Sequence, residues 1–158
     1  MSLHKHARMN DESALKKDLK SGVNVNERDK FGAAPLHYAL SESNCEIAVI
    51  LIEHGADVSC TDGDGKTPLH YAIEYEQYEL AEKIISADAK VVHVPDNDGN
   101  TPLWAAVFNA GSSVKFVELL LKNEASAKTT NRAGRSPSDL ATKLGDTRLI
   151  ELLTSADV

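Results

Sequence analysis

Aromatic residues and cysteines are scarce in this chain of 158 residues, and long apolar runs are missing. Aromatic residues make up 5% of the chain although 42% of it is apolar, so aliphatic side chains must fill the core. Two cysteines, Cys45 and Cys60, form no disulfide framework and no metal-ligand pattern, which favours a reducing compartment. We expect Cys45 in the core and Cys60 exposed near a turn.

Segments that cross or enter a membrane are also missing from the sequence. No run of about 18 apolar residues is present, and the first residues lack the apolar core of a signal peptide. We therefore expect a cytoplasmic protein that does not contact a membrane.

Motifs that carry catalysis or bind a cofactor are not found either. Residues 62–65 and 96–99 resemble the start of calcium loops, but their glycine is fourth rather than sixth and no closing glutamate follows. Gly65 and Lys66 resemble the end of a phosphate-binding loop, whose first glycine would fall on Cys60. Because no nucleophile elbow and no Cys/His pair is present either, we predict no enzyme, no metal and no cofactor.

The negative charge is concentrated in the middle of the chain. The net charge is −7, and residues 42–98 contain 13 acidic residues and three lysines, whereas both ends are slightly basic. Such a field repels nucleic acid and steers a basic protein towards the chain. A surface that serves solubility alone is the alternative interpretation.

A proline recurs at Pro35, Pro68, Pro102 and Pro137, in steps of 33, 34 and 35 residues. A glycine stands three residues before each proline, an Asp or Asn six before, and an alanine four after. A fixed period of this length predicts a repeat array in which each unit buries its apolar face against its neighbours. The longer steps indicate one extra residue near 92–95 and two near 110–113.

One unit can be followed over residues 62–91. Turn-forming residues come first, and Gly65 supplies the positive φ of a tight turn. Thr67 is a good N-cap and Pro68 a good first helical residue. Apolar residues at helical spacing then predict two short helices: Leu69, Ala72, Ile73, Leu80, Ala81, Ile84 and Ile85.

Four short segments carry a family resemblance. They are Ala-Pro-Leu-His-Tyr-Ala at 34–39, Thr-Pro-Leu-His-Tyr-Ala at 67–72, Thr-Pro-Leu-Trp-Ala-Ala at 101–106 and His-Gly-Ala-Asp-Val at 54–58. They resemble the ankyrin repeat signature, and the match covers roughly residues 14–154. The resemblance implies an all-α solenoid of stacked β-turn/helix/helix units, with a concave face made by turn tips and first helices. It also implies that His37 and His70 bond to the backbone of a neighbouring turn and are structural.

The resemblance divides the chain into one domain of several units. Their expected limits are about 1–28 for an N-terminal partial or capping unit, 29–61, 62–95 and 96–130 for full repeats, and 131–158 for a C-terminal capping repeat. Polar residues at Ser138 and Asp139 suit a cap. Residues 3–10 match a first helix poorly, so we expect His4 and His6 in a flexible tail.

Partner contacts are expected where turn tips and first helices differ between units. The positions carried over from the family are Arg28, Lys30, Phe31, Asp64, Lys66, Glu74, Tyr75, Asn97, Asp98, Asn100, Trp104, Phe108, Arg132 and Arg135. Further positions of this kind are Ala33, Ser41, Glu42, Asn109 and Lys143.

Aromatic residues stand out among these positions. Phe31 is a candidate anchor, and Tyr75, Trp104 and Phe108 are expected to form an aromatic strip. Trp104 replaces the usual histidine, and packing between units competes with binding as its role. Tyr38 and Tyr71 stand at equivalent positions, where a stacked ladder is expected.

The sequence therefore predicts a non-catalytic protein-interaction module or scaffold that is a monomer when free. A dedicated inhibitor or immunity-type protein that masks a basic toxin or enzyme is one alternative. A structural or self-associating array is the other.

Overall fold

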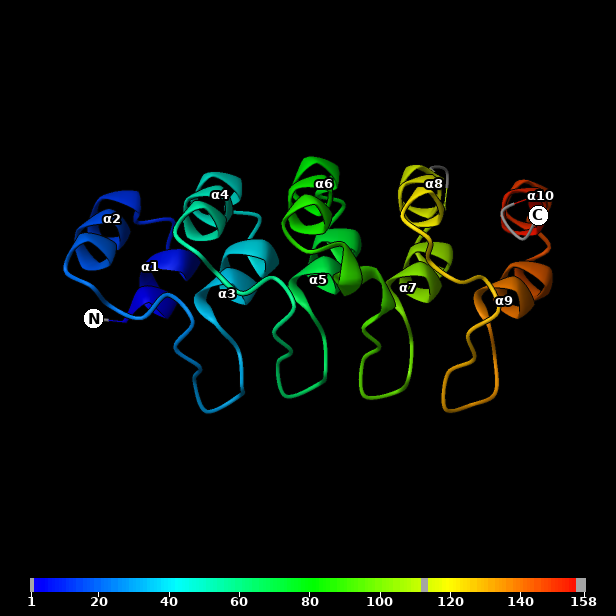
Figure 1. Ribbon diagram of the computed structural model, residues 1–158, viewed down its shortest axis with the longest axis horizontal. Helices are drawn as coiled ribbons and strands as arrows, with labels where there is room; N and C mark the ends of the chain where they lie inside the picture. The colour runs from blue at the N-terminus through cyan, green and yellow to red at the C-terminus, as the bar shows by residue number, and fades with distance from the viewer. Residues whose placement is uncertain (1, 112–113, 156–158) are drawn as a thin grey trace.

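The computed structural model describes residues 2–111 and 114–155, which form a row of paired helices. The inner helices are α1 (Leu3–Arg8), α3 (Pro35–Ser41), α5 (Pro68–Glu74), α7 (Pro102–Phe108) and α9 (Pro137–Leu144). The outer helices are α2 (Glu12–Lys20), α4 (Cys45–Glu53), α6 (Tyr78–Ala87), α8 (Lys115–Lys122) and α10 (Thr147–Ser155). Figure 1 shows the pairs stacked side by side in two layers, with the termini at opposite ends. The predicted all-α repeat array is confirmed.

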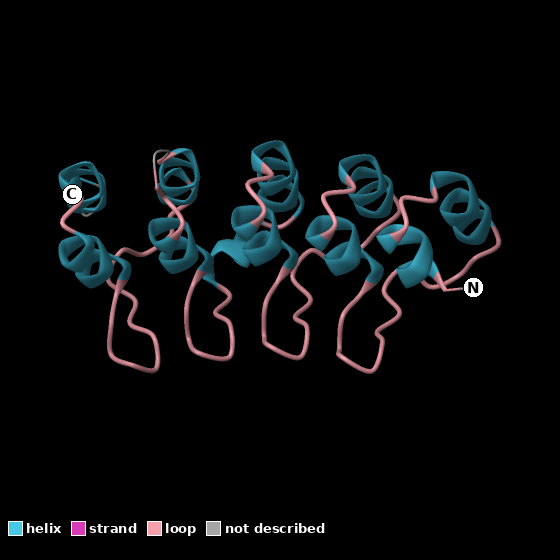
Figure 2. Cartoon of the chain, turned by 180° about the vertical axis from the view of Figure 1, so that it is seen from behind, coloured by secondary structure: helices cyan, strands magenta, loops and turns pink. Residues whose placement is uncertain are grey.

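Four long loops, which we call fingers, join each outer helix to the next inner helix. They comprise residues 21–34, 54–67, 88–101 and 123–136, and Figure 2 shows all four projecting from the same side of the array. The third finger contains the 3-10 helix η1 (Ala89–His93), close to the extra residue expected from the 34-residue step. Residues 112–113, part of the other expected insertion, lie outside the described residues.

The recurring proline is the first residue of four inner helices. In α5, Thr67 is the extended N-cap and Pro68 follows it, where a missing N–H costs no helical hydrogen bond. Leu69, Ala72 and Ile73 are buried on one side of this helix, which packs between α3 and α7. Each unit thus shares its core with both neighbours, as expected for a repeat array.

The fingers lie so close together that their backbones form hydrogen bonds. The N–H of Asn97 donates to the carbonyl oxygen of Asp64 at 3.0 Å, and that of Arg132 to Asp98 at 2.9 Å. Gly65 has φ +78°, and a Cβ atom there would lie 2.6 Å from the backbone nitrogen of Asn97. Glycine is therefore required both for the turn and for the close approach of the next finger.

The N-terminal residues form a helix, so the predicted flexible tail is wrong. Leu3 and Ala7 of α1 are fully buried, and His6 is buried as well. The His4 Nε2 lies 3.1 Å from the Ala33 carbonyl oxygen. Helix α1 packs on α3 and covers its apolar side, which would otherwise face solvent. Tertiary packing therefore orders a segment that lacks the helix-starting proline of the later units.

Cys45 is exposed, which contradicts its predicted place in the core. It precedes the buried Ile47 by two residues and therefore points about 200° away from it around α4. Cys60 is partly buried, and burial together with nearby Asp57 raises the pKa of its thiol to about 11.

Candidate functional site: the finger face

The tips of the fingers (residues 28–34, 61–67, 95–101 and 130–136), together with the exposed sides and C-terminal ends of the inner helices, form one continuous surface, which we call the finger face; Val23, at the base of the first finger, lies outside it. It is hollowed in two places. A cavity of about 720 Å³ lies between the first two fingers, with Phe31, Tyr38 and Asp64 in its wall. A smaller cavity of about 250 Å³ lies between α5 and α7, with His70 and Phe108 in its wall.

Buried histidines join helices α3 and α5 to the finger that follows each of them. Nδ1 of His70 accepts the N–H of Thr67 at 3.2 Å, and its Nε2 lies 3.2 Å from the Asn100 carbonyl oxygen. Nδ1 of His37 accepts the N–H of Ala34 at 3.1 Å, and its Nε2 lies 3.2 Å from the carbonyl oxygen of residue 66. The predicted structural role of both histidines is confirmed, and burial lowers the pKa of each.

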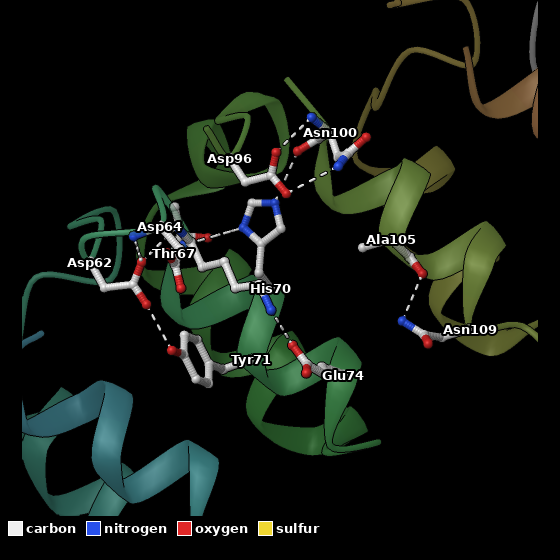
Figure 3. Close-up of polar contacts among 11 residues, drawn as sticks. Asp62, Asp64, Thr67, His70, Tyr71, Glu74, Asp96, Asn100, Ala105 and Asn109 are labelled. Carbon is white, nitrogen blue, oxygen red and sulfur yellow. Dashed lines mark hydrogen bonds and ion pairs between the residues drawn. The ribbon is translucent and has the colours of Figure 1, made fainter. Parts of the chain in front are cut away.

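The tyrosines of the first two full units bind the aspartate that opens the turn in the finger before their own helix. The Tyr38 hydroxyl donates to Asp29 Oδ2 at 2.6 Å, and the Tyr71 hydroxyl donates to Asp62 Oδ2 at 2.7 Å, as Figure 3 shows for Tyr71. Oδ1 of Asp62 meanwhile accepts backbone N–H groups inside the turn. Each aspartate thus uses one oxygen to shape the finger and the other to hold a phenol.

The two tyrosines do not stack on each other, so the predicted tyrosine ladder is wrong. The ring of Tyr71 meets His37 of the preceding unit edge-on at 5.5 Å between centroids. Tyr38 meets His4 in the same way at 5.9 Å. The histidine of one unit and the tyrosine of the next therefore form the repeating contact.

Exposed aromatic rings are distributed over three places on the finger face. Phe31 lies at the tip of the first finger, with 61% of its surface exposed and Lys30 Nζ 4.9 Å from its ring centroid. Tyr75 stacks on Tyr71 at the end of α5. Phe108 stacks on Trp104 in α7, with ring centroids 5.4 Å apart. The expected strip of Tyr75, Trp104 and Phe108 is thus resolved into two separate stacked pairs.

Trp104 interrupts the series of histidines. Its indole Nε1 is buried and has no hydrogen-bond partner within residues 2–111 and 114–155. The contact that His37 and His70 make with the next finger is therefore not repeated between the third and fourth full units.

Charged residues at the fingertips are basic at the two ends of the row and acidic in its middle. Lys30 on the first finger is followed by Asp64, Asp98 and Arg132 on the next three, and all four are exposed. The outer helices carry another part of the acidic block: Glu46, Glu53, Glu79 and Glu82. The negative field of residues 42–98 is therefore shared between two faces.

One ion pair lies at the centre of the face. Lys66 Nζ is 2.6 Å from Glu74 Oε2. Burial acts to lower the pKa of the Lys66 ammonium group, but Glu74, together with Asp62 and Asp64, outweighs burial and raises this pKa. Lys66 and Glu74, both predicted to contact a partner, thus neutralise each other within the chain.

Several of the other predicted contact residues make hydrogen bonds within the array. The guanidinium of Arg28 donates to the carbonyl oxygen of Thr61, and the Asn97 amide donates to that of Gly63 at 2.9 Å. Asn100 donates to Asp96 Oδ2 at 3.2 Å and accepts from Asn131 at 2.8 Å. Arg135, in contrast, is exposed at the fourth finger. All fourteen predicted residues lie on the finger face, but these three have a structural role in addition.

Sequence reasoning missed two exposed apolar residues on this face. Met9 is the C-cap of α1 and Leu144 is the last residue of α9, and both side chains are largely exposed. They stand at the position that Tyr75 and Glu42 occupy in their own units. Counting the period back from Glu42 and forward from Tyr75 would have found them.

Comparison with known proteins agrees with this architecture. A family model described as "Ankyrin repeats (3 copies)" matches residues 3–94, and one described as "Ankyrin repeat" matches residues 98–132. The chain belongs to the ankyrin repeat family. Ankyrin repeats generally mediate protein–protein interaction and are typically non-catalytic.

Relatives with a curated description share only part of their length with this ankyrin repeat chain. The ankyrin repeat protein FPV222 of fowlpox virus (strain NVSL) is 28% identical over 141 residues, covering 89% of the chain and 18% of the viral protein. Acyl-CoA-binding domain-containing protein 2 of Arabidopsis thaliana is 38% identical over 56 residues, covering 35% of the chain and 16% of the plant protein. The chain thus spans less than a fifth of either relative.

The described residues contain no group of three or more His, Cys, Asp or Glu side chains that could hold a metal ion. Nor does any helix among them have the length and apolar character to cross a membrane.

Proposed function

We propose that the chain binds another protein through the finger face and carries out no covalent chemistry. The proposal is supported by the distribution of exposed apolar side chains over the surface. Six large apolar side chains are exposed among the described residues, and five lie on the finger face: Met9, Phe31, Tyr75, Phe108 and Leu144. Exposed apolar groups gathered on one face are typical of an interaction surface.

Polar surroundings favour a specific partner over unspecific adhesion. Phe31 stands between Lys30 and the acidic tip of the second finger, and Phe108 stands near the Lys66–Glu74 pair. Aromatic anchors within a charged rim are the usual composition of an interface. Since Asp64 and Asp98 are the exposed charges of the two middle fingertips, the partner surface opposite them is basic.

The test is affinity capture with the intact chain as bait, at low and at high salt, followed by mass spectrometry. A bait carrying Phe31→Ala, Tyr75→Ala and Phe108→Ala is compared with one carrying Val23→Ala, the exposed apolar residue outside the finger face. We expect the native and Val23→Ala baits to retain the same basic protein, and the triple variant to lose it while its circular dichroism is unchanged. High salt should weaken capture because exposed charges steer the association.

A folded triple variant that retains every partner would exclude the finger face as the interface. Capture of only further copies of the chain, with a defined oligomer in light scattering, would instead favour the self-associating array.

A further inference from the structure

The third full unit lacks a ring that the two units before it contain. Asp29 and Tyr38, and Asp62 and Tyr71, are each nine residues apart and joined by a short hydrogen bond. The third unit keeps the aspartate as Asp96, but Ala105 stands nine residues later, where a tyrosine is expected. A carboxylate that holds a phenol in two units is therefore kept without its phenol in the third.

The space that this ring would fill is open. The 250 Å³ cavity between α5 and α7 has Ala105 in its wall, together with Asp96, His70 and Glu74. Figure 3 shows Ala105 on α7 opposite His70 and Glu74 of α5, with Asp96 and Asn100 at one end. A cavity of this size suits one side chain, since pockets for drug-sized molecules measure about 300–1,000 Å³.

The walls of the cavity correspond to the surroundings of Tyr71. His37 of the preceding unit meets the Tyr71 ring edge-on, and His70 takes the place of His37 one unit later. Asp62 accepts the Tyr71 hydroxyl, and Asp96 takes the place of Asp62. Two of the contacts that position Tyr71 are therefore reproduced around an opening.

Asp96 has an oxygen available for a further donor. Its Oδ1 accepts the N–H groups of Asp98 and Asn100, as in the other turns. Its Oδ2 accepts the Asn100 side-chain amide at 3.2 Å, longer than the 2.6 and 2.7 Å of the phenol contacts in the earlier units. Each carboxylate oxygen has two lone pairs, so a hydroxyl can donate to Oδ2 alongside the amide.

We propose that this cavity receives the phenol ring of a tyrosine side chain supplied by the partner protein, with its hydroxyl donating to Asp96 and its ring edge against His70. This proposal rests on the proposed function, because it assigns a partner residue to one place on the finger face. The aliphatic and aromatic walls from Ala105 and Phe108 contact the ring, and the carboxylate of Asp96 at the hydroxyl end disfavours a phosphorylated tyrosine.

The test titrates the chain with N-acetyl-tyrosinamide and follows backbone amide resonances by NMR. We expect saturable shifts at Asn100 and Phe108, one site per chain and a Kd on the order of 1 mM, as for a small fragment. N-acetyl-phenylalaninamide lacks only the hydroxyl. It should bind at least about tenfold more weakly, because it cannot donate a hydrogen bond to Asp96 Oδ2.

Two substitutions and a control locate the site. Ala105→Tyr supplies the missing ring from within the chain and should abolish binding while raising the melting temperature. Tyr71→Ala opens the equivalent space one unit earlier and should add a second site. Ala133→Tyr places a tyrosine on the exposed fourth finger and should leave binding unchanged.

The absence of saturable shifts, or equal binding by the Ala105→Tyr variant, would overturn the proposal. Equal affinity for the tyrosine and phenylalanine amides would also overturn it, because the contact with Asp96 would then be lacking. These measurements need no partner protein, so they succeed or fail separately from the capture experiment.

Discussion

Acidification should destabilise the array through the two histidines that join its units. Nδ1 of His37 and of His70 accepts a backbone N–H, so a proton bound there would face another donor. Both rings are also buried, and burial lowers their pKa. The unfolded chain then binds protons more readily than the folded chain, so stability is complete above the unfolded pKa of about 6.5 and is lost as the pH falls below it.

The size of the effect follows from linkage. For each histidine that stays neutral in the folded chain, the free energy of unfolding falls by about 1.4 kcal/mol for every pH unit below about 6.5. Between about pH 7.5 and about pH 5.5, two such histidines lower the free energy of unfolding by up to about 3 kcal/mol. This is a large part of the stability of a domain, which amounts to about 5–15 kcal/mol.

The surroundings of the rings set how much of this limit is reached. Asp62 near His37, and Asp96 near His70, favour the protonated form, whereas Lys66 opposes it at His70. Burial is the largest influence on both rings, so the pKa of each remains lowered.

Urea denaturation followed by circular dichroism measures the effect. The native chain should show a midpoint about 1 M lower or more at about pH 5.5 than at about pH 7.5. The double variant His37→Gln/His70→Gln is the control, because glutamine can accept the N-cap N–H and donate to the next finger without titrating. Its midpoint should depend less on pH, while the remaining histidines titrate in both proteins. Equal pH dependence of the two proteins would refute the reasoning.

Two further substitutions probe the fingers. Gly65→Ala should lower the free energy of unfolding by about 2 kcal/mol or more in urea denaturation, since φ is +78° and a Cβ would meet the backbone of Asn97; a neutral result would contradict the close finger contact. Tyr71→Phe should cost about 1–2 kcal/mol by removing the hydrogen bond to Asp62. Because burial and then Asp62 raise the Tyr71 pKa, this contribution is present below about pH 10 and is lost above it, so the two proteins should converge in alkaline solution.

The fold could be predicted in detail where local residues dictate it. The turn before each inner helix depends on an aspartate, a glycine and a Thr-Pro or equivalent pair, whose conformations are set within a few residues. The roles of His37 and His70 were implied by the family resemblance, since their contacts reach the next finger about 30 residues away. Helix α1 was not predicted because its local signals are weak and packing on α3 orders it. Leu3 and His4 do stand 33 residues before Leu36 and His37, a correspondence that sequence reasoning missed.

The sequence could predict which face carries the candidate residues, but not the contacts that these residues make. The family pattern named residues that lie on the finger face, but it could not show that Arg28, Asn97 and Asn100 form hydrogen bonds with neighbouring fingers. Contacts between units depend on distances across the array, which spacing along one chain does not give.

A departure from the repeat is informative only when the groups around it are unchanged. Taken by itself, Ala105 is an ordinary small residue in an inner helix and indicates no binding site. It gains meaning because Asp96 and His70 keep the positions from which Asp62 and His37 hold Tyr71. At Trp104 the replaced residue and its hydrogen bond are both lost, so this position gives no comparable guide to a ligand. Comparing equivalent positions in successive units of the array thus shows where a side chain from the partner is expected.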